Sequence, residues 1–219
     1  LHSAFIKEFV ETFPEMKFFV MYGQTEATAR LSYLPPELVL DKLGSIGKAI
    51  PDVVLDIHNE DGRSVAVGEV GEIVARGNNI MIGYLDDPEG TEASLKNGWL
   101  HTGDMARRDE DGFFYLVARK KEIIKVRGKR VSPKEIEEVI VGIPEVVDCT
   151  IEGIEDELLG EAIKAFIVLT DGTDETLGKE LIQKTCSQKL AMHKIPQVFE
   201  FKNRLDVNQA GKKVKKAGF

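Results

Sequence analysis

The chain has 219 residues, of which 42% are hydrophobic and 30% are charged, and its formal net charge at pH 7 is −8. This apolar content can build a core, which excludes wholesale disorder, and no apolar run approaches the roughly 20 residues that span a bilayer. The acidic balance argues against a nucleic-acid binder. The first residues lack a basic region followed by an apolar region, so we expect no signal peptide. The two cysteines lack metal-ligand spacing, and we expect a cytoplasmic protein with reduced thiols.

The first part of the chain predicts a helix and then a strand. Residues 3–12 place apolar side chains on one face, which is the pattern of an amphipathic helix. The continuous apolar run at residues 18–22 is typical of a buried strand in a parallel sheet. A polar loop follows this strand at residues 23–26.

The residue pattern changes near residue 44, and the new pattern lasts to residue 118. Glycines separate short β-rich runs there, and residues 59–62 and 109–112 have the composition of hairpin turns. A short helix is expected near residues 87–95. We therefore expect a compact and mostly antiparallel β subdomain over residues 44–118.

The last hundred residues predict a small α+β domain. Ser132 to Glu135 form a capping box with Pro133 at the first helical position, so a helix begins there. A second helix is expected over residues 174–188. The expected strands are residues 123–126, 146–151, 162–169 and 197–201, with a strand-like Val131.

The balance of charged residues changes at the same place as the residue pattern. Residues 1–118 carry 10 basic and 20 acidic residues, whereas residues 119–219 carry 19 and 17. The change falls at residues 119–121, which we take as a domain boundary.

The segment Tyr22-Gly23-Gln24-Thr25-Glu26 could bind a nucleotide. The glycine lets the backbone approach a ligand closely, the threonine hydroxyl can donate to a phosphate, and the glutamate can hold Mg²⁺. Such a loop follows the carboxyl end of a strand, where open α/β sheets bind ligands. The alternative is an ordinary turn between a strand and a loop.

Three further segments carry candidate chemistry, each with a structural alternative. Asp104 could accept hydrogen bonds from a ribose diol, or it could be a turn residue. Residues 119–130 hold seven cations, which could form an anion site, a nucleic-acid patch or an exposed strand edge. Lys212 could be a mobile point charge after a glycine, or part of a frayed terminus.

Six motifs in order give these weak signals a common interpretation. The motifs are YGQTE, GSIGKAIP, GEIVARGNNIMIGYLDD, GWLHTGD, DGFFYLVARKKEIIKVRGKRVSPKEIEEVI and NQAGKK. Together they resemble the adenylate-forming superfamily, and most of all its AMP-forming acyl-CoA synthetases.

The resemblance implies roles for the first motif. Tyr22 would stack on adenine or line the acyl pocket, and Gly23 would belong to the nucleotide site. Thr25 would touch the phosphate, and Glu26 would hold Mg²⁺.

The resemblance also implies roles near the boundary. Asp104 would bind the ribose hydroxyls, and Arg119 would contribute from the domain junction. Lys121 would be the hinge of a mobile C-terminal domain. Lys125 would act in thioester formation, and Gly128 would line the coenzyme A channel.

The whole reaction follows from the same resemblance. An acid–thiol ligase would convert a carboxylic acid, ATP and coenzyme A into acyl-CoA, AMP and pyrophosphate through an acyl-adenylate. This reaction belongs to fatty acid metabolism in the nearest branch. Lys212 would reach the carboxylate and the α-phosphate during adenylation.

The resemblance implies only part of the fold, because no segment matches the Ser/Thr/Gly-rich phosphate loop of the family. We expect an α/β part with a β-rich subdomain in residues 1–118 and a small mobile α+β domain in residues 119–219. The N-terminal part of the large domain would be missing, and this chain would be inactive alone. The alternatives are an adenylation domain that loads a carrier protein, and a non-catalytic binding module.

Overall fold

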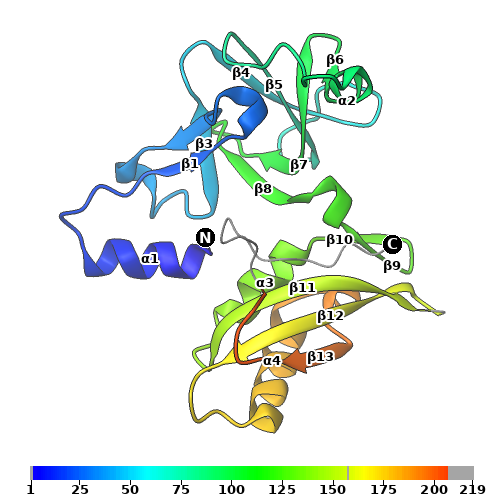
Figure 1. Cartoon of the computed structure of the whole chain (residues 1–219). Coiled ribbons are helices and arrows are strands. Elements are labelled where there is room, and N and C mark those ends of the chain that lie inside the picture. The colour runs from blue at the N-terminus through cyan, green and yellow to red at the C-terminus, as the bar shows by residue number, and fades with distance from the viewer. Residues whose placement is uncertain (1, 157, 207–219) are drawn as a thin grey trace. The chain divides into compact units, whose positions relative to one another are not determined.

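A computed structural model describes residues 2–156 and 158–206. The chain divides into two compact units, of which the first is Ser3–Lys121 and the second begins at Glu122 (Figure 1). Each unit has its own sheet and its own buried side chains.

Helix α1, Ser3–Thr12, opens the first unit with the bounds that the sequence predicts. Its Ile6 side chain is buried. The ring of Phe9 lies 5.2 Å from the rings of Phe13 and Phe18, which anchors the helix end to the segment that follows.

Strand β1, Val20–Tyr22, corrects the prediction of a buried parallel strand. It is shorter than the apolar run, and its partner β2, Ser32–Leu34, runs antiparallel to it. Since β1 lies at the edge of the sheet, alternate side chains face solvent, and Met21 is 49% exposed. The apolar run therefore does not mean two-sided burial here.

Eight antiparallel strands form the sheet of the first unit, in the order β1-β2-β3-β8-β7-β5-β4, with β6 paired to β7 (Figure 1). The predicted antiparallel β region is confirmed, and β3 joins it to β2. The remaining elements are η1 Thr25–Ala27, η2 Pro36–Leu38, β3 Ser45–Ala49, β4 Val53–His58, β5 Gly71–Gly77, α2 Pro88–Ser94, β6 Leu95–Lys96, β7 Trp99–Arg108, β8 Phe114–Arg119 and η3 Lys120–Glu122.

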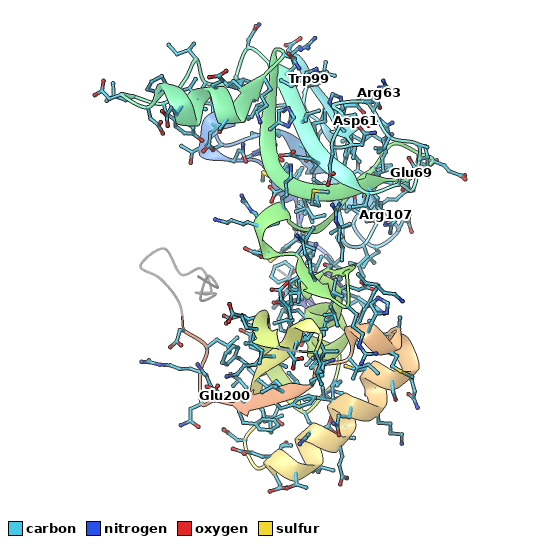
Figure 2. The ribbon with its side chains drawn as sticks, turned by 90° about the vertical axis from the view of Figure 1, so that its right-hand side faces the viewer. Asp61, Arg63, Glu69, Trp99, Arg107 and Glu200 are labelled. Carbon is cyan, nitrogen blue, oxygen red and sulfur yellow. The ribbon has the colours of Figure 1, made fainter. Side chains whose placement is uncertain are left out.

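The two predicted turns of this region are present. The amide of Gly62 donates to the carbonyl of Asn59, and the amide of Gly112 donates to that of Asp109, at 3.0 Å in both cases. Asp61 and Arg63, labelled in Figure 2, lie at the first of these turns. The second turn joins β7 to β8 and so fixes the register of that pair.

The second unit is the small α+β domain that the sequence predicts. Its sheet has the order β10-β9-β12-β11, and β13 pairs in parallel with β12. The elements are β9 Ile124–Val126, β10 Lys129–Val131, α3 Pro133–Val141, β11 Val146–Asp156, β12 Gly160–Leu169, α4 Glu175–Lys189, η4 Met192–Lys194 and β13 Val198–Phe201.

Helix α3 begins where its capping residues predict. The Ser132 side chain accepts a hydrogen bond from the Glu135 amide at 3.3 Å, and Pro133 stands at the first helical position. Ile136 and Ile140 on this helix are fully buried, as is Ile182 on α4. The helices therefore cover the apolar face of the sheet.

Two further observations concern the described part of the chain. None of its helices has the length and apolarity needed to cross a bilayer. Within these residues neither Cys149 nor Cys186 forms a disulfide, and both side chains are buried.

Limited proteolysis tests the division into units. Lys120 and Lys121 are exposed in the connection between them, so brief trypsin treatment should first release a fragment that ends at one of these lysines. Mass spectrometry of the fragments measures this. The double variant Lys120→Gln/Lys121→Gln should lose the cuts after these two residues, whereas earlier cleavage inside residues 44–118 would contradict the boundary.

Candidate functional site

A buried carboxylate lies at the centre of the first unit's polar cluster. Asp104 on β7 is only 5% exposed. The Tyr22 hydroxyl donates to its Oδ2 at 2.7 Å, and Nε of Arg119 lies 2.7 Å from its Oδ1. Asp104 and Arg119 are direct partners in the β7–β8 ladder. A buried charge needs such pairing, so the cluster fixes three strands at one point.

Tyr22 keeps its proton in this environment. Burial and then the neighbouring Asp104 carboxylate hold the pKa of the Tyr22 phenol well above its ordinary value. The phenol is therefore a hydrogen-bond donor throughout the physiological pH range. It comes from the last residue of β1, so it brings the loop that follows β1 to the same place.

The β7 backbone just before Asp104 is held from two sides. The Thr102 hydroxyl donates to the carbonyl of Ile73 at 2.8 Å and accepts from the Asp104 amide at 3.1 Å. Gly103, with a positive φ of 72°, donates its amide to Glu72 at 3.0 Å. These bonds orient the Asp104 backbone.

Glu72 on β5 is a site residue that the sequence analysis missed. Its Oε2 lies 3.2 Å from Nδ1 of His101 and 3.1 Å from Nζ of Lys120. Burial alone would raise the Glu72 pKa, but the hydrogen bonds from His101, Lys120 and the Gly103 amide outweigh it and hold the pKa below its ordinary value. The available signal was that Glu72 is the one acidic residue of β5.

The loop after β1 is compact because Gly23 has no side chain. A Cβ at this position would lie 2.3 Å from the carbonyl oxygen of Ala29, which is a backbone atom that cannot yield. The loop therefore returns directly over its own start, and the Leu31 amide donates to the Tyr22 carbonyl at 2.8 Å. Thr25 is exposed on this loop.

The Glu26 carboxylate is held at one of its two oxygens. Its Oε1 accepts from the Tyr84 hydroxyl at 2.7 Å, and this hydrogen bond raises the pKa of Tyr84. Within the described residues, no cluster of three or more metal-ligating side chains exists. One carboxylate completed by substrate phosphates is the way proteins commonly hold Mg²⁺, so Glu26 fits that ion.

Two family models match the chain. The model described as "AMP-binding enzyme" matches residues 1–85, and the model described as "AMP-binding enzyme C-terminal domain" matches residues 135–212. The chain belongs to the AMP-binding enzyme family, in its acyl-CoA synthetase branch.

Named relatives agree with this assignment. A long-chain-fatty-acid–CoA ligase of Yersinia pestis is 38% identical over 191 residues, which cover 87% of this chain and 33% of the relative. The o-succinylbenzoate CoA synthetase MenE of Bacillus subtilis, solved with the acyl-adenylate OSB-AMP, is 32% identical with a TM-score of 0.87, covering 97% of this chain and 42% of MenE. The same enzyme solved with ATP and a magnesium ion is 33% identical with a TM-score of 0.85, covering 94% and 42%.

The chain thus spans about a third of the length of the curated relatives that it matches. The predicted partial adenylate-forming fold is confirmed, since each of these solved structures extends well beyond the matched part.

The first unit of this AMP-binding enzyme brings Tyr22, Asp104 and Arg119 into direct contact. Gly23, Thr25 and Glu26 lie on the loop that leaves this cluster. Lys121 is the last residue of the first unit and lies within η3.

The second unit holds Lys125 and Gly128 on one hairpin. Arg127 and Gly128 both have positive φ, at 50° and 75°, and form the two-residue turn between β9 and β10. The Lys125 amide donates to Glu161 at 2.6 Å, and Lys125 is exposed. The predicted catalytic Lys212 lies outside the described residues.

The depressed pKa of Glu72 makes a stability prediction. The ionised Glu72 carboxylate contributes fully to the free energy of unfolding above its unfolded-state pKa. This contribution is lost as pH falls through the lower folded-state pKa. Glu72→Gln should therefore lower the free energy of unfolding at pH 7 by about 1–3 kcal/mol, and the difference from wild type should vanish in acid. The single tryptophan, Trp99 (Figure 2), reports urea unfolding of this unit.

Glu110→Gln is the matched control, because Glu110 is exposed. An equal loss of stability in both variants, or a Glu72→Gln effect that persists unchanged at pH 3, would contradict the charge-paired role of Glu72.

Proposed function

We propose that this chain forms part of an AMP-forming acyl-CoA synthetase, in which its first unit binds ATP and its second unit serves thioester formation. The single observation that carries the proposal is the buried Asp104 carboxylate, shared between Tyr22 and Arg119 at the loop that follows β1. The membership of the chain in the family supports it.

The Asp104 cluster suits a ribose. A carboxylate accepts hydrogen bonds at both of its oxygens, which matches the two hydroxyls of a diol. Arg119, which is 46% exposed at its side chain, can meet the same ligand from its open side. Tyr22, the partner of Asp104, is the last residue of β1, so the loop that carries Thr25 and Glu26 starts beside the Asp104 cluster.

Thr25 and Glu26 would then face the phosphates. The Thr25 hydroxyl can donate to a phosphate oxygen, and Glu26 would hold Mg²⁺ through its second oxygen. When bound, Mg²⁺ neutralises phosphate charge during attack at the α-phosphorus. The solved relative with ATP and a magnesium ion supports this pairing.

The reaction joins two anions in its first half, so it needs positioned cations. The substrate carboxylate attacks the α-phosphate and releases pyrophosphate, and we assign Lys212 to hold these oxygens together. Coenzyme A then attacks the acyl-adenylate and releases AMP. We assign Lys125 and the Gly128 turn to this second half, with Lys121 as the pivot between the two arrangements.

Nucleotide titration of the chain tests the proposal directly. AMP should bind, and Asp104→Asn should weaken it by about 10-fold or more, because a hydrogen bond to a charged group contributes about 1.5–3 kcal/mol. Isothermal titration calorimetry measures the Kd values. Asp41→Asn at an exposed position is the control and should bind like wild type. No AMP binding at millimolar concentration would instead favour the non-catalytic module.

Separate half-reactions test the lysines in an enzyme that carries this chain. Lys212→Ala should slow adenylation of a fatty acid by roughly 10²–10³-fold, as expected for the loss of one donor to developing charge. Thioester formation from supplied acyl-adenylate should be unchanged, because that transition state does not use the interaction.

Lys125→Ala should show the reverse pattern, and Lys121→Pro should block only the second half-reaction by fixing φ at the pivot. Lys213→Ala is the control for position along the terminal motif. If Lys212→Ala slows both half-reactions equally, then the assignment of two alternating arrangements is wrong.

A further inference from the structure

The segment of residues 77–84 lies between the end of β5 and α2 (Figure 1), and it hydrogen-bonds to the loop of residues 24–30. Its Asn79 side chain makes two hydrogen bonds to that loop. The amide Nδ2 donates to the carbonyl of Ala27 at 3.0 Å and to that of Arg30 at 2.8 Å. Because one side chain binds both carbonyls, Asn79 links the two ends of the turn at residues 27–30.

The loop needs such support because its backbone is unusual. Thr28 and Ala29 have consecutive positive φ angles of 51° and 67°, in the left-handed region that residues with a Cβ rarely adopt. The Thr28 hydroxyl donates to the Asn79 carbonyl at 2.7 Å, and the Met81 amide donates to the Glu26 carbonyl at 2.8 Å. Segment 77–84 thus holds the Glu26 backbone from outside.

Tyr84 holds the Glu26 side chain. The phenol hydroxyl donates to Oε1 at 2.7 Å, and Tyr84 is itself anchored, since its amide donates to the Thr91 hydroxyl at 2.8 Å. A carboxylate with one oxygen bound in this way has a fixed plane, and its second oxygen faces a fixed direction.

We propose that Asn79 and Tyr84 are positioning residues, which hold Glu26 so that one carboxylate oxygen faces a divalent cation on the nucleotide phosphates. This inference rests on the proposed function, which gives Glu26 its cation. Asn79 fixes the backbone of the loop and Tyr84 fixes the carboxylate. Neither residue touches the reacting atoms.

The test compares Tyr84→Phe with Tyr33→Phe in the full 219-residue chain. Both tyrosines are 38% exposed, and among the described residues the Tyr33 hydroxyl has no hydrogen-bond partner, so the pair is matched. Electron paramagnetic resonance measures binding of Mn²⁺ in the presence of ATP. Tyr84→Phe should weaken Mn²⁺ binding by about 10-fold, the usual loss when the partner of a metal ligand is removed. Tyr33→Phe should have no effect.

A second measurement does not need the nucleotide. In ¹³C NMR spectra of the free chain, Tyr84→Phe should shift the Glu26 carboxyl resonance, and Tyr33→Phe should leave it in place. Asn79→Ala should speed hydrogen exchange at the Met81 amide by about 10-fold or more, because the loop loses its tie. Asn78→Ala is the matched neighbour and should exchange like wild type.

The outcomes separate this inference from the proposed function. The positioning role is overturned if Tyr84→Phe binds Mn²⁺ with ATP as tightly as wild type and if its Glu26 carboxyl resonance does not move. If wild type binds no Mn²⁺ with ATP, the proposed function of the chain fails, and the NMR shift and the exchange rates still decide whether Asn79 and Tyr84 hold Glu26.

Discussion

The buried carboxylate of Asp104 is the constraint on which the first unit depends. A buried charge is costly unless donors surround it, and here the donors come from Tyr22 and Arg119. These residues belong to three strands, and the Tyr22 contact spans 82 positions along the chain. Misplacing either donor would cost the buried carboxylate a strong hydrogen bond. The pairing that stabilises the fold therefore also positions Asp104, the candidate residue for ribose binding. Stability and binding thus depend on the same cluster.

The loop that carries Thr25 and Glu26 is held in a different way. Strand pairing fixes Asp104, whereas loop-to-loop hydrogen bonds fix Glu26. Gly23 allows the loop to fold back on itself, and Asn79 and Tyr84 support it from the next connection. The sheet thus carries the buried Asp104, and a loop that neighbouring residues support carries Thr25 and Glu26. Binding sites commonly combine a rigid scaffold with functional loops in this way.

Local patterns in the sequence determined most of the elements and the candidate residues. The helix over residues 3–12 follows from its periodicity, and α3 follows from the cap at Ser132 with Pro133 behind it. The turn at residues 109–112 follows from its acidic residues and glycine. Each of these features depends on side chains within a few positions of one another, so the order of residues carries the information. The six motifs also indicated the family, because their order needs no folded structure to be read.

Only the tertiary structure decided which elements meet. The antiparallel edge position of β1 depends on β2, and an apolar run cannot report the direction of its partner. Glu72 joins the site because β5 lies beside β7, and Tyr84 reaches Glu26 across 58 positions. The sequence contains all these residues inside conspicuous motifs, yet it assigns them no contact. Contacts over such separations depend on strand register and on how loops pack, and these are set by the whole chain and not by neighbouring residues.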